Sequence, residues 1–123
     1  RAVFKMFGPG RVVLISDTMR AAGMTDGAYD LGGQEVTVKG PLATLADGTI
    51  AGSVTDLMAC MKTAVSFGIP LADAVRSAAV SPAQAIGIFD RVGSLDSGKR
   101  ANVVVLDKEL DVKAVFFKGA QGG

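Results

Sequence analysis

The chain has 123 residues, enough for one ordinary domain with a core of its own. Hydrophobic residues make up 49%, which excludes a disordered chain, and the 13 basic and 12 acidic residues are scattered. No basic run points to nucleic acid or to a membrane surface, and no apolar run reaches the roughly 18 residues of a membrane helix. The sequence has no histidine, so it supplies neither a usual zinc site nor a Ser–His pair.

The single cysteine, Cys60, rules out an internal disulfide and fits a reducing compartment such as the cytoplasm. We interpret it as a small packed residue, because no nearby base or cation would activate it.

The first residues predict an α/β unit. Residues 1–7 carry apolar side chains at helical spacing and stop at Gly8-Pro9-Gly10, which is typical of the last turns of a helix. Since the first residue is Arg1 and not Met, we expect a piece of a longer protein. Residues 12–16 are a continuous apolar run, which predicts a strand buried on both faces of a parallel sheet. A long glycine-bearing loop, residues 17–27, follows.

The middle of the chain predicts a small β-excursion followed by helices. Residues 34–39 alternate between turn signals, and residues 42–45 end at Asp47-Gly48. Ser53 and Asp56 have capping-box spacing and predict a helix that begins at Ser53 and ends at Gly68.

Two further helices are expected after Pro70. One spans about residues 70–79, and another begins with Ser81 as its N-cap and ends near Gly87. The segments 103–106 and 112–117 are rich in β-formers and predict strands that pair with sheet segments elsewhere. The tail GAQGG is expected to fray.

Asp17 stands at the tip of the predicted strand 12–16. A carboxylate there normally needs a metal, a cation or converging donors, and functional side chains gather at the carboxyl ends of parallel strands. The alternative is that Asp17 caps its own turn through loop amides. The stretch DGTIAGS, which leads into the predicted helix at Ser53, would add free N–H groups close to Gly52.

Several stretches together resemble the N-acetylglucosamine-6-phosphate deacetylase family of the amidohydrolase superfamily. They are VVLISDTMRAAGMTDGAYDLGG, LADGTIAGS, SPAQAIGI, VGSLDSGKRANVVVLD and VFFKG, in that order. The stretch VGSLDSGKRANVVVLD is shared by many amidohydrolases, whereas the first two stretches are specific to the deacetylases. One departure is Thr18, where many members have alanine.

The resemblance implies an α/β fold: the C-terminal part of a TIM barrel with part of a small β-sandwich. Residues 1–90 would hold the eighth barrel strand, the β-excursion and helices, and residues 91–123 the returning sandwich strands. It further implies a homodimer that acts on an amino-sugar phosphate, and a divalent metal ion such as zinc or iron. The metal ligands would lie outside this chain, apart from at most a contact by Asp17.

Carried over by motif, Asp17 would be catalytic, and Ile50, Ala51 and Gly52 would bind substrate. Asp17 would take a proton from the water that attacks the acetamide carbonyl, and then protonate the leaving amine. We expect the isolated chain to be inactive. The alternatives are another amidohydrolase, of the dihydroorotase or dipeptidase kind, and a non-catalytic α/β module.

Overall fold

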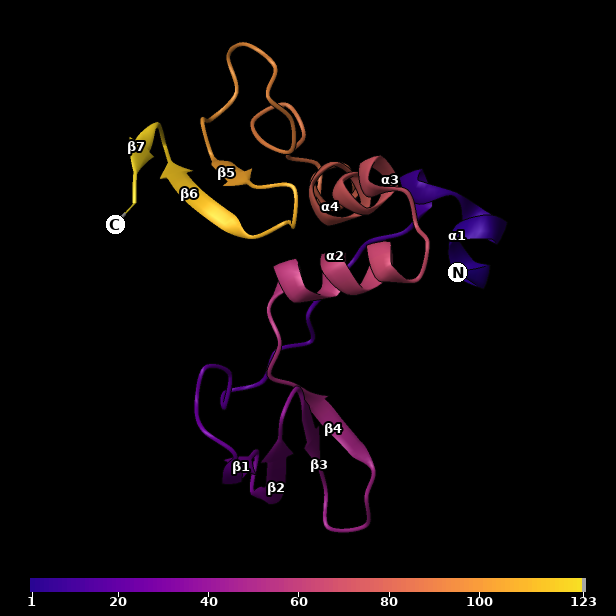
Figure 1. The fold of residues 1–123 in the computed structure, drawn as a ribbon, viewed down its shortest axis with the longest axis vertical. Helices are drawn as coiled ribbons and strands as arrows, with labels where there is room; N and C mark the ends of the chain where they lie inside the picture. Colours follow the sequence, from indigo (N-terminus) through magenta and orange to yellow (C-terminus); the bar gives the residue numbers. More distant parts are fainter. Residues whose placement is uncertain (123) are drawn as a thin grey trace. The chain divides into compact units, whose positions relative to one another are not determined.

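The computed structural model describes residues 1–122 and shows two sheets and a set of helices (Figure 1). The chain divides into two compact units, one made of Arg1–Val13 with Ala64–Gly123 and the other of Leu14–Thr63. The predicted division near residue 90 refers to the complete barrel and stays a prediction. Among the described residues, no helix combines the length and the apolar character that crossing a bilayer requires.

The unit of residues 14–63 is built on a four-stranded antiparallel sheet in the order β1-β2-β3-β4 (Figure 1). Its strands are β1 (Gly27–Leu31), β2 (Gln34–Lys39), β3 (Leu42–Thr44) and β4 (Ile50–Ser53). The predicted strands 34–39 and 42–45 are therefore confirmed, the second to within one residue. Strand β1 was not predicted; it pairs with β2 across the tight Gly32-Gly33 turn.

One face of this sheet carries the core of the unit. Val36, Val38 and Ala43 are fully or almost fully buried, because alternate residues of a strand point to the same face. The loop after Asp17 contributes Met19 and Ala21 to the same cluster. The loop is therefore anchored to the sheet by apolar contacts, at least through its first half.

The predicted strand of residues 12–16 forms no ladder within residues 1–122, which corrects that prediction. The segment leaves the short helix η1 (Pro9–Arg11) in an extended conformation at Val12. Val13 and Ile15 are 40% and 69% exposed. A strand of a parallel sheet requires neighbours on both sides, and no other segment of residues 1–122 pairs with this one.

The helix predicted to begin at Ser53 begins later. Residue Ser53 ends strand β4, and helix α2 spans Leu57–Ser66. The Ser53 amide donates to the Asp17 carbonyl (3.1 Å), so it is committed to the strand and is not the start of a helix. Asp56 caps the helix instead, because its Oδ1 accepts the Ala59 amide at 2.7 Å. The end at Gly68, with φ of +83°, is confirmed.

Residues 71–85 form one continuous helical segment where two helices were predicted. It comprises α3 (Leu71–Val75), the wider π-turn η2 (Arg76–Val80) and α4 (Ser81–Ala85). Ser81 is therefore not an N-cap; it is buried, and its hydroxyl donates to the Pro9 carbonyl at 2.8 Å. The π-turn, in which the Ser81 amide bonds to the Arg76 carbonyl, precedes Pro82, whose ring a regular turn accommodates poorly. The predicted end at Gly87 is confirmed.

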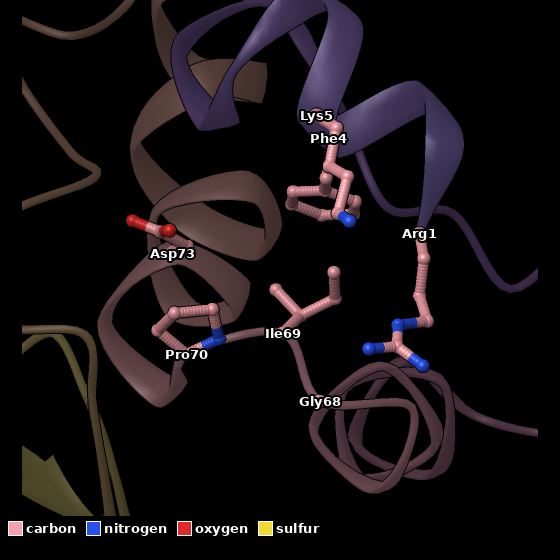
Figure 2. A pocket seen from close by; sticks show the side chains of 7 residues that line it. All are labelled: Arg1, Phe4, Lys5, Gly68, Ile69, Pro70 and Asp73. Atoms are coloured by element: carbon pink, nitrogen blue, oxygen red, sulfur yellow. The ribbon is translucent and has the colours of Figure 1, made fainter.

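The first helix, α1 (Ala2–Phe7), ends at Gly8 as predicted. A pocket of about 210 Å³ lies beside it (Figure 2). In Figure 2 the Arg1 guanidinium lies over Gly68, and its nearest nitrogen is 3.8 Å from where a Gly68 Cβ would stand. Since the carbonyl end of a helix is partly negative, this cation stabilises the end of α2.

The predicted C-terminal strands are confirmed as β5 (Val103–Leu106) and β6 (Val112–Phe117). They pair with each other and with β7 (Ala120–Gln121), in the order β5-β6-β7. The expectation that residues 119–122 fray is therefore wrong for Ala120 and Gln121, and Gly123 lies outside the described residues. Val104 and Phe117 lie on the same face of this sheet and remain 50% and 61% exposed, so that face is not covered within residues 1–122.

A substitution at Gly93 tests how closely this residue packs against the helical segment of residues 71–85. A Cβ at this position would lie 2.7 Å from the Ala83 Cβ, and φ is +94°. We expect Gly93→Ala to lower the free energy of unfolding by roughly 2–4 kcal/mol, since left-handed strain and overpacking add. The control is Gly98→Ala, which has the same strain (φ +87°) but open space and should cost only about 1–2 kcal/mol. Equal losses in urea unfolding would refute the steric contact.

Asp96 provides a test of electrostatics. A hydrogen bond from the Ser94 hydroxyl, followed by the bond and charge of Lys99, lowers the pKa of Asp96 below its ordinary 3.8. Because the folded pKa is the lower one, the ionised carboxylate stabilises the fold above the unfolded pKa, and this contribution disappears as the pH falls through the folded pKa. NMR titration should show that Ser94→Ala raises the Asp96 pKa. An unchanged value would contradict the assignment.

Candidate functional site

Asp17 occupies a strained backbone position that two backbone hydrogen bonds hold. Its φ is +50°, in the left-handed region that non-glycine residues seldom adopt. The Asp17 carbonyl accepts the Ser53 amide at 3.1 Å, and the Met19 amide donates to the Ser53 carbonyl at 2.9 Å. These two bonds make a parallel bridge between Thr18 and Ser53. Non-glycine residues persist in such conformations only where the surroundings enforce them, and here the end of β4 does so.

The Asp17 side chain is exposed, and within residues 1–122 its carboxylate has no hydrogen-bond or ion-pair partner. The alternative role as a turn cap requires a loop amide that donates to this carboxylate. The turns after Asp17 are closed by backbone bonds instead, Ala22 to Met19 and Met24 to Ala21. The carboxylate is therefore available to a ligand.

The segment 50–52 lies beside Asp17, but as a strand and not as a helix start. A Cβ on Gly52 would stand 3.6 Å from the Asp17 carbonyl oxygen, so the two backbones are in contact. Strand β4 is at the edge of its sheet, and its register with β3 shifts at a bulge that leaves Ala51 unmatched. Ile50 is 67% exposed, whereas Ala51 packs on the core. The free N–H groups of a helix start, which were predicted close to Gly52, are therefore absent there. Gly52 lies instead in an irregular edge strand.

A chain of hydroxyl groups that was not predicted connects the two segments. The Thr18 hydroxyl donates to the Thr55 carbonyl at 2.7 Å and lies 2.5 Å from Ser16 Oγ. The Thr55 hydroxyl bonds to Ser53 Oγ at 2.7 Å, with Cys60 Sγ 3.7 Å away. Cys60 is half-buried in α2, in line with a packing role. Only the isolated Ser and Thr positions, which lie 37 residues apart, could have indicated this network.

A hollow of about 510 Å³ opens next to these hydroxyl groups. Polar side chains from both segments and small residues of the loop line it: Ser16, Thr18, Ala22, Gly23, Val54, Thr55, Asp56 and Leu57.

The described residues do not build a metal centre. Within residues 1–122, no three His, Cys, Asp or Glu side chains come together. Asp17 is a lone carboxylate at the site, so any metal ion at this position would need its ligands from outside this part of the chain.

Residues 15–123 match the model of the amidohydrolase family. The chain belongs to the amidohydrolase family. It is 42% identical over 110 residues to the N-acetylgalactosamine-6-phosphate deacetylase of Escherichia coli O157:H7, covering 89% of this chain and 29% of that protein. It is 36% identical over 120 residues to the N-acetylglucosamine-6-phosphate deacetylase of Bacillus subtilis, covering 97% and 30%.

Among solved amidohydrolases, a mutant N-acetyl-D-glucosamine-6-phosphate deacetylase of Mycobacterium smegmatis, in complex with N-acetyl-D-glucosamine 6-phosphate, is 39% identical. It superimposes with a TM-score of 0.89 over 98% of this chain and 32% of its own. The family and the fold class implied by the motifs are confirmed. The chain spans less than a third of the length of these three relatives.

Substitutions of Asp56 test whether this residue caps helix α2, whose first residues line the hollow. We expect Asp56→Ala to lower the free energy of unfolding by about 1 kcal/mol, because the Ala59 amide loses its cap. Asp56→Asn should keep most of the stability, since the asparagine oxygen also accepts from this amide. Urea unfolding with equal losses for both variants would contradict the capping role.

Proposed function

We propose that this chain is the C-terminal portion of an enzyme that hydrolyses the acetamide of N-acetylglucosamine 6-phosphate to glucosamine 6-phosphate and acetate. The observation that carries the proposal is the Asp17 carboxylate, exposed and unpartnered within residues 1–122, on a strained backbone fixed beside Gly52. The names of the relatives support the same reaction and substrate class.

Asp17 acts in this proposal as the proton carrier of the reaction. Its carboxylate accepts a proton from the water that attacks the acetamide carbonyl. It then delivers that proton to the amine nitrogen as the carbon–nitrogen bond breaks, so acetate and the free amine leave and the carboxylate is restored.

Amidohydrolases work with a divalent metal ion, which lowers the pKa of water and polarises a carbonyl. Residues 1–122 do not hold such an ion on their own. We therefore place its ligands in the part of the enzyme to which the other two thirds of the relatives correspond, and we expect this chain alone to be inactive.

Segment 50–52 is proposed to contact the sugar phosphate. The bulge at Ala51 interrupts the ladder with β3, and Ile50 exposes an apolar side chain beside it. Gly52 is itself buried against Asp17 and Met19, so a ligand would meet this segment at Ile50 and the half-buried Ala51 first. From the resemblance we also propose a homodimer, and from the single cysteine a cytoplasmic location.

A second substrate is favoured by one finding. A relative with 42% identity is named for N-acetylgalactosamine 6-phosphate, the 4-epimer of the first substrate. The acetamide and the phosphate are common to both sugars, so the same proton transfer serves either. Comparing kcat/KM for the two epimers in the complete enzyme decides between them.

Replacing Asp17 tests the catalytic role. In the complete enzyme, Asp17→Asn should reduce kcat about 10²–10⁴-fold with little change in KM, because the amide cannot carry the proton. The assay follows acetate release. The control is Glu35→Gln, which removes the same charge from an exposed position of β2 and should leave kcat unchanged.

Each alternative makes a different forecast. If Asp17→Asn retains full activity, the residue has a structural role and a non-catalytic module becomes the better account. If the enzyme turns over dihydroorotate or a dipeptide and leaves both acetylated sugar phosphates intact, another amidohydrolase activity replaces the proposed one.

A further inference from the structure

The bonds that surround Asp17 differ in kind. Two of them join backbone atoms of residues 17–19 to Ser53 and would form with almost any side chains. The third is the bond from the Thr18 hydroxyl to the Thr55 carbonyl, at 2.7 Å, and it depends on the identity of residue 18. Of the three bonds, only the one made by the Thr18 side chain therefore depends on the amino acid at its position.

The position of Thr18 couples it directly to the strained residue. Thr18 follows Asp17 in the chain, so its anchor limits rotation about the Asp17 backbone, where φ is +50°. The same hydroxyl lies 2.5 Å from Ser16 Oγ, on the other side of Asp17. A single hydroxyl thus contacts the residue before Asp17 and the loop after β4.

The loop at the other end of this bond is itself fixed. The Thr55 amide donates to Ser53 Oγ at 3.0 Å, and the two hydroxyls bond at 2.7 Å. The next residue, Asp56, caps α2. The Thr55 carbonyl is therefore a rigid acceptor, held between the end of β4 and the start of α2.

We propose that Thr18 is a positioning residue for Asp17. Through its bond to the Thr55 carbonyl, Thr18 holds the Asp17 carboxylate in a fixed position relative to segment 50–52. The inference rests on the proposed function, in which Asp17 carries the proton. Thr18 touches neither proton nor substrate; its hydroxyl reduces the freedom of the turn that presents the carboxylate. Small displacements of a reacting group have large effects on rate, so the loss should appear in kcat.

The test uses Thr18→Val in the complete enzyme, which keeps the shape and the branched Cβ and removes only the hydroxyl. We expect kcat to fall about 10-fold with KM unchanged. This is the effect of losing one neutral hydrogen bond at an exposed site, where water partly replaces the lost partner. Thr18→Ser, which retains the hydroxyl, should restore kcat to within about 2-fold. The control Thr37→Val alters an exposed threonine of β2 and should change neither constant.

A double-mutant cycle separates positioning from a general structural effect. If Thr18 acts through Asp17, Thr18→Val should have no further effect on the residual activity of Asp17→Asn. A further 10-fold loss in that background, or an unaltered kcat in the single variant, would overturn the inference. Circular dichroism and thermal unfolding establish the folded fraction by which every rate is normalised.

The proposed function fails separately. If Asp17→Asn keeps wild-type activity, the proton-carrier role is refuted, and the positioning inference with it. If Asp17→Asn is impaired while Thr18→Val equals the wild type, only the positioning inference is refuted.

Discussion

The left-handed backbone of Asp17 is the constraint on which the candidate site depends. A non-glycine residue in this conformation is strained by roughly 1–3 kcal/mol, and it persists only when its neighbours leave no alternative. Here the neighbours are the end of β4 and the loop after it, joined to residues 17–19 by two backbone bonds and the Thr18 hydroxyl. The Asp17 carboxylate is exposed, and within residues 1–122 no loop amide donates to it.

The small sheet supplies the rigidity that this arrangement needs. Val36, Val38 and Ala43 form a core on one face of β2 and β3, and Met19 and Ala21 from the loop after Asp17 are buried in it. Residues on both sides of the site are thus attached to the same four-stranded support. The β-excursion, which looks like an insertion when read from the sequence, is the base on which Asp17 and segment 50–52 are held together.

The sequence predicted best what local chemistry decides. The strands 34–39, 103–106 and 112–117 appear with the predicted bounds, since alternation and β-branched residues act within the segment itself. Gly8, Gly68 and Gly87 end helices as expected. The motifs also identified the family correctly, because they carry side chains at fixed spacing that no local rule demands.

The wrong predictions occur where a residue with a local sequence signal bonds instead to a partner that is distant in sequence. Ser53 and Ser81 both have the spacing of helix caps. The backbone of Ser53 instead bonds to residues 17–19, and the Ser81 hydroxyl bonds to the Pro9 carbonyl, 72 residues away in sequence. The run of residues 12–16 has the composition of a barrel strand, but a strand exists only with its neighbours, and residues 1–122 provide none. The hydroxyl network around Thr18 was invisible for the same reason.

The most direct test of the account is the structure of the complete enzyme with an N-acetylhexosamine 6-phosphate bound. The account predicts an Asp17 carboxylate oxygen within about 2.6–3.2 Å of the water that faces the acetamide carbonyl, with the backbone of segment 50–52 against the sugar. A carboxylate that bonds to amides of its own loop, or a sugar bound away from Asp17 and Gly52, would contradict it.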